Sequence, residues 1–373
     1  MNASTFTGCD QDRPVVSPEK LGSIDALRGL AAIYVVICHV GFIPHPDLTL
    51  PTLGARFVEA GHTGVILFFL ISSFTLCLSS AKRNAEKNHH AKFYLRRLFR
   101  ILPLFYFSVL LACARDYHLN GITPSWSTIT SSIAGVFIPG KTDNIVWGSW
   151  TLGIELTFYL IFPFLFAWAN SLWRTVYIFA ILASADLIAV RLILQGQDVK
   201  LHPIRFGLLH NIPFFIIGLI FYYVYRYLNE ERIQARMLGY AVLSISVGLF
   251  LGLLIFSPKS LTNLSTHGHY LVAASMLLLM VGLLIHPTRI IVNSITIYWG
   301  QISYSLYLLH PPLVHLLIPV YRFFYNHTPW PVIAYILSLF LTLCILIPFA
   351  VVSYKFIEAP GIKLGSLISK RYL

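Results

Sequence analysis

Residues 24–43 read IDALRGLAAIYVVICHVGFI and form the first long apolar run of a 373-residue chain. Comparable runs recur at approximately 62–80, 98–115, 148–168, 175–194, 206–228, 237–256, 270–286, 295–318 and 332–356. A run of about 20 apolar residues is long enough to cross a bilayer as a helix, whereas barrel strands are shorter and alternate. The sequence therefore predicts an all-α, polytopic membrane protein with about ten transmembrane helices.

The composition agrees with lipid as the solvent. Hydrophobic residues make up 57% and charged residues 11%, too few charges to cover a soluble domain of this size. The net charge of +12 is interpreted as Lys and Arg kept on the cytoplasmic side, and no motif indicates a nucleic-acid partner. The five cysteines include no Cys-x-x-Cys pair, so neither a metal site nor a disulfide framework is expected.

Charge counting gives the orientation. If the N-terminus is cytoplasmic, the inner segments hold 18 of the 27 Lys and Arg residues and the outer segments hold 8, with Arg28 inside the first span. The excess on the inner side predicts that both termini are cytoplasmic. We expect a cytoplasmic tail over 1–22, a transmembrane domain over 23–357, a cytoplasmic tail over 358–373, and a multi-pass location in the cell membrane, the inner membrane if the source is bacterial.

Three polar residues share one stripe of the first span. Asp25 and Arg28 are three residues apart and can pair, while Arg28 and His39 are eleven apart, which returns to nearly the same face after a rise of about 16 Å. Charges in a span are costly and usually face a polar interior, and imidazole suits proton transfer near neutral pH. The structural alternative is a snorkelling Arg28 and a hydrogen-bonded His39 without a chemical role.

Arginines cluster at the start of the third span. Arg96, Arg97 and Arg100 lie at a helix N-terminus, where the helix dipole disfavours cations, and Arg96 and Arg100 are expected on one face. A multiply charged anion such as a phosphate would explain the cluster, since guanidinium binds phosphate in a bidentate manner. A positively charged loop that touches anionic lipid is the structural alternative.

Further polar groups interrupt the later spans. Glu155 and Tyr159 share a face of the fourth span, and an isolated carboxylate there must be paired or protonated. Trp150 lies near the outer boundary, and Tyr307 and His310 precede an expected helix break at Pro311 and Pro312. The polar intrusions for which we assign no role are Asp186, His210 and Asn211. Glu358 is expected to close the last helix with a cap or salt bridge.

Together these groups predict a polar track across the membrane, suited to moving a molecule or to joining two reactants from opposite sides. A secondary transporter or flippase could use the same track, but the internal symmetry common in transporters is not visible. A non-catalytic scaffold or sensor would leave the Arg28–His39 face and the arginine cluster without an explanation.

Five stretches, in this order, carry a family resemblance: Asp25-Ala-Leu-Arg28-Gly-Leu-Ala-Ala with His39; Gly64-Val65 with Phe68-Phe-Leu-Ile-Ser72; Arg96-Arg97-x-x-Arg100-x-x-Pro103; Ser149-Trp150-Thr-Leu-x-x-Glu155-x-x-x-Tyr159; and Ser303-Tyr-Ser-Leu-Tyr307-Leu-Leu-His310-Pro311. They resemble the acyltransferase 3 family, membrane-integral enzymes of which many are bacterial O-acetyltransferases of surface glycans. The resemblance covers about residues 22–360.

The resemblance implies a ten-helix core that takes an acyl group from cytoplasmic acyl-CoA, acetyl-CoA by default, and passes it to a hydroxyl of a sugar or glycan. It implies that Arg28 and His39 are a catalytic pair, assisted by Asp25 and Glu155. It also implies that Arg96, Arg97 and Arg100 bind CoA phosphates. The acceptor-binding set is then predicted as Trp150, Tyr159, Tyr307 and His310. No metal is expected.

The chain departs from the family's pattern in two places. Ser73 stands where relatives usually have Gly, which leaves a close backbone approach at that point in question. Many relatives carry a further C-terminal esterase-like domain, for which this sequence is too short. Whether His39 is a general base or a transient acyl carrier stays open, as do the acceptor, the acyl group and the formation of a homodimer.

Overall fold

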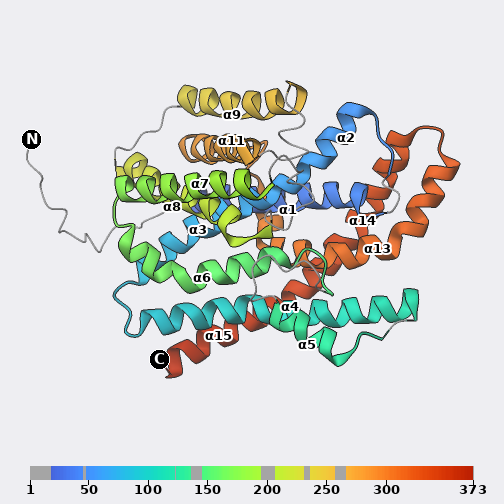
Figure 1. The fold of residues 1–373 in the computed structure, drawn as a ribbon, viewed down its shortest axis with the longest axis horizontal. Helices are drawn as coiled ribbons and strands as arrows, with labels where there is room; N and C mark the ends of the chain where they lie inside the picture. The colour runs from blue at the N-terminus through green and yellow to red at the C-terminus, as the bar shows by residue number, and fades with distance from the viewer. Residues whose placement is uncertain are drawn as a thin grey trace, which may run out of the picture.

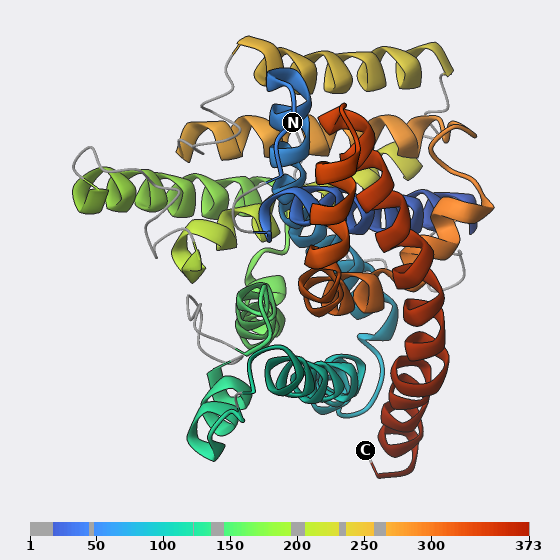
Figure 2. The ribbon, with the colours of Figure 1, turned by 90° about the vertical axis from the view of Figure 1, so that its right-hand side faces the viewer.

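The structure is a computed structural model that describes residues 18–44, 48–121, 123–135, 145–194, 206–230, 236–256 and 266–372. Within these ranges the chain is helical with short connections and forms no strand. In both views of the ribbon, α9 and α11 lie on one side, α4 lies on the opposite side, and α1 and α3 lie between them (Figure 1, Figure 2). Most of the expected tail over 1–22 lies outside the described residues.

The helices have the following bounds: α1 Pro18–Phe42, α2 Thr52–Glu59, η1 Ala60–Thr63, α3 Gly64–Arg83, α4 His89–Asn120, α5 Trp126–Gly135, α6 Trp150–Trp168, α7 Leu172–Leu194, α8 Leu208–Glu230, α9 Arg236–Phe256, α11 Thr266–Ile285, α12 Ser294–Gln301, α13 Ser303–His327, α14 Pro331–Ser353, the π-helical turn η4 Tyr354–Glu358, and α15 Ala359–Tyr372.

Nine helical segments of the described chain are long and apolar enough to cross a membrane. They correspond to nine of the ten expected runs, so the prediction of a polytopic all-α protein is confirmed. The orientation of the two termini stays a prediction.

The remaining run, 295–318, differs from the prediction. It begins as α12, whose start is capped by Asn293, and breaks at Ile302 before α13. The expected break at Pro311 and Pro312 is wrong, because α13 continues through both prolines to His327. Proline costs a helix little inside a membrane protein when neighbouring groups satisfy the freed carbonyls.

The last helix also continues further than predicted. Glu358 does not close it, because the chain passes through η4 directly into α15, which packs against α4. Glu358 is buried and accepts a hydrogen bond from Ser305 Oγ at 2.9 Å, which ties this turn to α13. The expected C-terminal tail is therefore a helix as far as Tyr372.

Two glycines hold α1 directly against α12. A Cβ at Gly300 would lie 1.9 Å from the carbonyl oxygen of Asp25, and a Cβ at Gly29 would lie 2.6 Å from the amide nitrogen of Gly300. No side chain larger than hydrogen fits at either position without moving the backbone. This contact fixes Asp25 and Arg28 relative to the start of α13.

The close approach questioned at Ser73 is present and is supplied by the other helix. A Cβ at Gly218 in α8 would lie 1.9 Å from Ser73 Oγ, which donates to the carbonyl of Leu70. The small residue needed for tight packing of α3 on α8 is therefore Gly218.

Because α1 and α12 are in direct contact, a larger residue at their interface is expected to disturb the packing. Gly300→Ala forces its new Cβ into the Asp25 carbonyl, and we expect the variant to lose about 1–3 kcal/mol of stability. Thermal unfolding of the purified protein in detergent measures the loss. Gly252→Ala is the matched control, because a Cβ there meets nothing within 4 Å and alanine favours a helix. Equal unfolding temperatures for the two variants would contradict the predicted contact.

Candidate active site

A cavity of about 760 Å³, its open mouth included, lies where five helices meet. Its polar lining comes from Arg28 in α1, Ser72 and Thr75 in α3, Arg97 and Arg100 in α4, Thr151, Glu155 and Tyr159 in α6, and Ser303, Tyr304 and Tyr307 in α13. The lining carries three guanidinium groups and one carboxylate, so the cavity has an excess of positive charge. It is suited to an anionic ligand.

Arg28 enters this cavity from α1. Its Nη1 lies 3.0 Å from Oδ1 of Asp25, as the three-residue spacing predicts, and its side chain is 16% exposed. Pairing offsets part of the cost of a charge in a span and points the guanidinium along the cavity wall.

Glu155 is held by hydrogen bonds from two helices. Its Oε1 accepts a bond from Ser72 Oγ at 2.7 Å, and Tyr159 donates to the same oxygen. The contact between Glu155 and Tyr159 follows from their four-residue spacing, whereas Ser72 entered the sequence analysis only as part of the family resemblance and was assigned no contact. These two hydroxyl donors hold the carboxyl group of Glu155 in place in the cavity wall.

The guanidinium of Arg97 lies close to two aromatic rings. Its guanidinium lies 5.7 Å from the ring centroids of both Phe93 and Tyr159, a cation–π arrangement. Its Nε is buried and has no hydrogen-bond partner within the described chain. Because a buried donor is usually satisfied, this nitrogen is a candidate donor to a ligand in the cavity.

The predicted arginine cluster is divided between two cavities. Arg97 and Arg100 line the cavity with Arg28, whereas Arg96 lines a second cavity of about 1400 Å³, its open space included. Arg97 contacts both. The second cavity also contains Arg83 and Arg226, so arginines from α3, α4 and α8 surround it.

Glu86 tunes the charge beside the second cavity. Arg96 Nη1 donates to Glu86 Oε2 at 3.0 Å, and Arg83 lies within 3.7 Å of the same carboxyl group. Burial opposes ionisation of Glu86, but the hydrogen bond from Arg96 and the nearby positive charges outweigh it and hold the pKa of this carboxyl below its usual value.

His39 does not line the cavity but contacts His310. The Nδ1 of His39 lies 2.6 Å from Nε2 of His310, and the two rings lie nearly parallel. Trp147 packs its edge against His39 with a centroid separation of 4.5 Å. Sequence reasoning did not single out Trp147, and it did not predict contact between the two histidines.

Tyr307 lines the cavity and also contacts His310. Its ring lies 5.7 Å from that of His310, and its hydroxyl interacts with Thr151 Oγ1 at 2.9 Å and donates to the Gly148 carbonyl at 3.2 Å. Gly148 has a φ of +81°, which favours glycine and brings this carbonyl to the hydroxyl. Tyr307 therefore connects the cavity that contains Arg28 with the histidine pair. Trp150 packs on Phe206 at a ring separation of 4.9 Å, and its acceptor-binding role stays a prediction.

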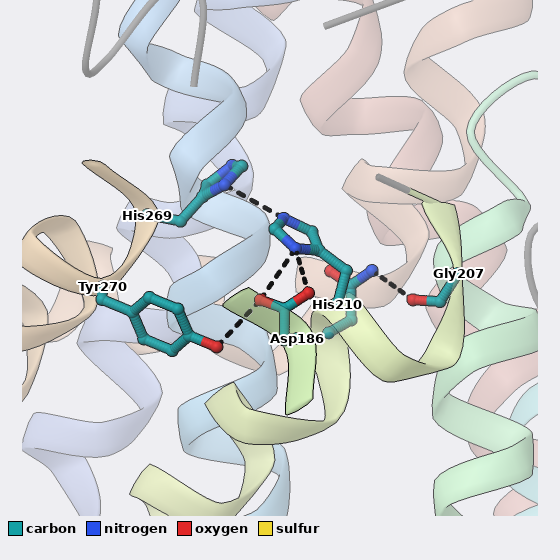
Figure 3. Close-up of polar contacts among 6 residues, drawn as sticks. Asp186, Gly207, His210, His269 and Tyr270 are labelled. Atoms are coloured by element: carbon teal, nitrogen blue, oxygen red, sulfur yellow. Dashed lines mark hydrogen bonds and ion pairs between the residues drawn. The ribbon is translucent and has the colours of Figure 1, made fainter. Parts of the chain in front are cut away.

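A second buried polar cluster joins α7, α8 and α11 (Figure 3). The carboxylate of Asp186 accepts from His210 Nδ1 at 3.0 Å and from the Tyr270 hydroxyl at 2.9 Å. His210 Nε2 lies 3.1 Å from His269 Nδ1, and Asn211 bonds the Gly207 carbonyl. These hydrogen bonds tie three helices together.

Comparisons with known proteins show the family to which the chain belongs. A family model described as an acyltransferase domain matches residues 21–351. The chain is 24% identical over 379 residues to the O-acetyltransferase OatA of Staphylococcus aureus strain NCTC 8325 / PS 47, and equally to OatA of strain COL. The match covers 94% of this chain and 58% of each relative, so the chain spans less than two thirds of their length. No solved structure matches the chain.

Removal of the Asp186 carboxylate is expected to lower the stability of the helical bundle. Asp186→Ala removes an acceptor from both His210 and Tyr270, and we expect a loss of about 1–3 kcal/mol in the thermal unfolding of the detergent-solubilised protein. Tyr270→Phe removes a single hydrogen bond and keeps the ring, so its loss is expected to be smaller. An unfolding temperature unchanged in Asp186→Ala would mean that the cluster does not stabilise the bundle.

Proposed function

The chain belongs to the acyltransferase 3 family, and on that premise we propose that it is an O-acyltransferase. It takes an acyl group, acetyl by default, from cytoplasmic acyl-CoA and passes it to a hydroxyl of a sugar or glycan. The single observation that carries the proposal is the convergence of Arg28, Arg97 and Arg100 on one cavity, whose lining residue Tyr307 contacts His310 of the His39–His310 pair.

The two cavities suit the two ends of a CoA thioester. The arginine-rich second cavity, with Arg83, Arg96 and Arg226, fits the phosphates of the nucleotide end. Arg97 lines both cavities and has a buried Nε that lacks an acceptor, which supports a phosphate or carbonyl oxygen bound at the junction. The inner cavity then receives the acyl-pantetheine arm, directed towards Tyr307.

In the proposed reaction, the polar residues at the two ends of α1 have different roles. Arg28 and His39 differ by eleven residues, a rise of about 16 Å along α1, which favours separate roles for the two side chains. We assign Arg28 to binding and orienting the donor, and His39 to activating the acceptor. Glu155, held by Ser72 and Tyr159, offsets the positive charge of Arg97 and Arg100.

In the direct route, the acceptor oxygen attacks the thioester carbon while His39 takes the hydroxyl proton. The new carbon–oxygen bond forms, the carbon–sulfur bond breaks, and the sulfur leaves with its electron pair and is protonated to the free thiol. In the two-step route His39 carries the acyl group first. Both routes need an unprotonated nitrogen on His39, directed at the reacting group.

The proposal predicts that His39→Ala abolishes transfer. General base catalysis contributes about 10²–10⁴-fold, so the labelled acetyl group that passes from acetyl-CoA to a sugar acceptor should fall by at least about 100-fold. His327→Ala is the matched control, because His327 is exposed at the far end of α13.

Full transfer by a folded His39→Ala protein would end the proposal. Movement of a labelled sugar across the membrane without consumption of acetyl-CoA would support a transporter or flippase instead.

If the second cavity binds the nucleotide phosphates of CoA, a substitution there should weaken the binding of acetyl-CoA but not of a donor that lacks these phosphates. Arg96→Ala should raise KM for acetyl-CoA about tenfold, because one charge-assisted hydrogen bond to phosphate is worth about 1.5–3 kcal/mol. The same variant should use acetyl-pantetheine, which lacks the nucleotide phosphates, as well as the unchanged enzyme does. Steady-state kinetics with both donors measures the difference. An equal rise in KM for both donors would show that Arg96 does not contact the phosphates.

A further inference from the structure

The contact between His39 in α1 and His310 in α13 determines which ring nitrogens carry a hydrogen, a point that the sequence left open. His310 is 1% exposed and contacts no charged side chain among its described neighbours. A charged imidazolium buried in this way would be costly, so His310 is neutral and carries one N–H. The position of that hydrogen follows from the partners of the ring.

The backbone of α13 determines which nitrogen of His310 is protonated. Nδ1 lies 3.2 Å from the carbonyl oxygen of Leu306, one turn earlier, and the backbone of Tyr307 also interacts with this ring. A carbonyl oxygen only accepts, so Nδ1 carries the hydrogen and Nε2 carries the lone pair. Pro311 lacks an N–H and leaves the Tyr307 carbonyl without its helical partner. Pro311 therefore leaves the Tyr307 carbonyl available to accept a hydrogen bond from the ring of His310.

The protonation of His310 determines that of His39. Nε2 of His310 is an acceptor, so the nitrogen 2.6 Å away, Nδ1 of His39, must donate. Neutral His39 then holds its lone pair on Nε2. The packing of Trp147 against the ring, at 4.5 Å, opposes its rotation out of this arrangement.

We propose that His310 is a positioning residue for the acyl transfer, rather than part of the acceptor-binding set that the sequence indicated. It accepts the Nδ1–H of His39, as a carboxylate does in many hydrolase triads, and so presents Nε2 of His39 to the reaction. This inference rests on the proposed function. When Nε2 takes the acceptor's proton, the resulting imidazolium keeps its hydrogen bond to His310, which becomes charge-assisted.

Three substitutions at His310 test the role. His310→Ala removes the acceptor, and we expect kcat to fall about 100-fold with KM for the donor and KM for the sugar acceptor unchanged. His310→Gln offers a side-chain carbonyl that accepts the same N–H, and should recover most of that loss. His310→Phe fills the space without an acceptor and should resemble the alanine variant. Thermal unfolding of each variant shows whether the bundle is intact.

His315→Ala is the matched control. His315 lies further along α13 and bonds the carbonyl of Pro311 at 2.8 Å, the same kind of contact as His310 to Leu306, and it is not part of the proposed machinery. We expect it to retain the full rate. A loss as large as that of His310→Ala would show a general effect of disturbing α13, and would overturn the inference.

The outcomes separate this inference from the proposed function. If His39→Ala is inactive and His310→Ala keeps the full kcat, the positioning role is wrong while the acyltransferase stands. A higher KM for the sugar with unchanged kcat in His310→Ala would return His310 to acceptor binding. If glutamine and phenylalanine at 310 give equal rates, the hydrogen bond does not matter. Absence of acyl transfer in the unsubstituted protein would remove the premise itself.

Discussion

The cost of placing guanidinium groups inside membrane-spanning helices is the constraint on which this structure depends. Arg28, Arg97 and Arg100 cannot face lipid without a large penalty, so the bundle is arranged around an interior cavity that accepts all three. Asp25 and Glu155 supply the nearby carboxylates, and the glycine contact between α1 and α12 holds the first arginine in place. The remaining excess of positive charge is what a phosphate-bearing donor would neutralise.

In the proposed mechanism, donor binding and acceptor activation take place at different positions along α1. Arginines surround the two cavities at one end, and the histidine pair lies beside Tyr307 at the other. An acyl group bound in the inner cavity would approach His39 beside Tyr307, which contacts both the cavity and His310. This arrangement is consistent with an enzyme whose donor and acceptor approach from different sides.

Local spacing was a good guide within single helices and gave little information between them. The pairs Asp25–Arg28 and Glu155–Tyr159 were predicted because three- and four-residue spacings place side chains on one face. His39 and His310 are 271 residues apart, so only the packing of α13 on α1 brings them together. The same is true of Asp186 and His210. The expected break at Pro311 and Pro312 was wrong because tertiary packing overrides local propensity in a buried helix.

The most direct test of the account uses donor and acceptor on opposite sides of one membrane. The purified protein is reconstituted into liposomes that contain acetyl-CoA labelled in its acetyl group, and a sugar acceptor is supplied only outside. The account predicts labelled acetyl ester on the external sugar, dependent on His39. Label that appears only when both substrates share one compartment, or no label in either arrangement, would contradict it.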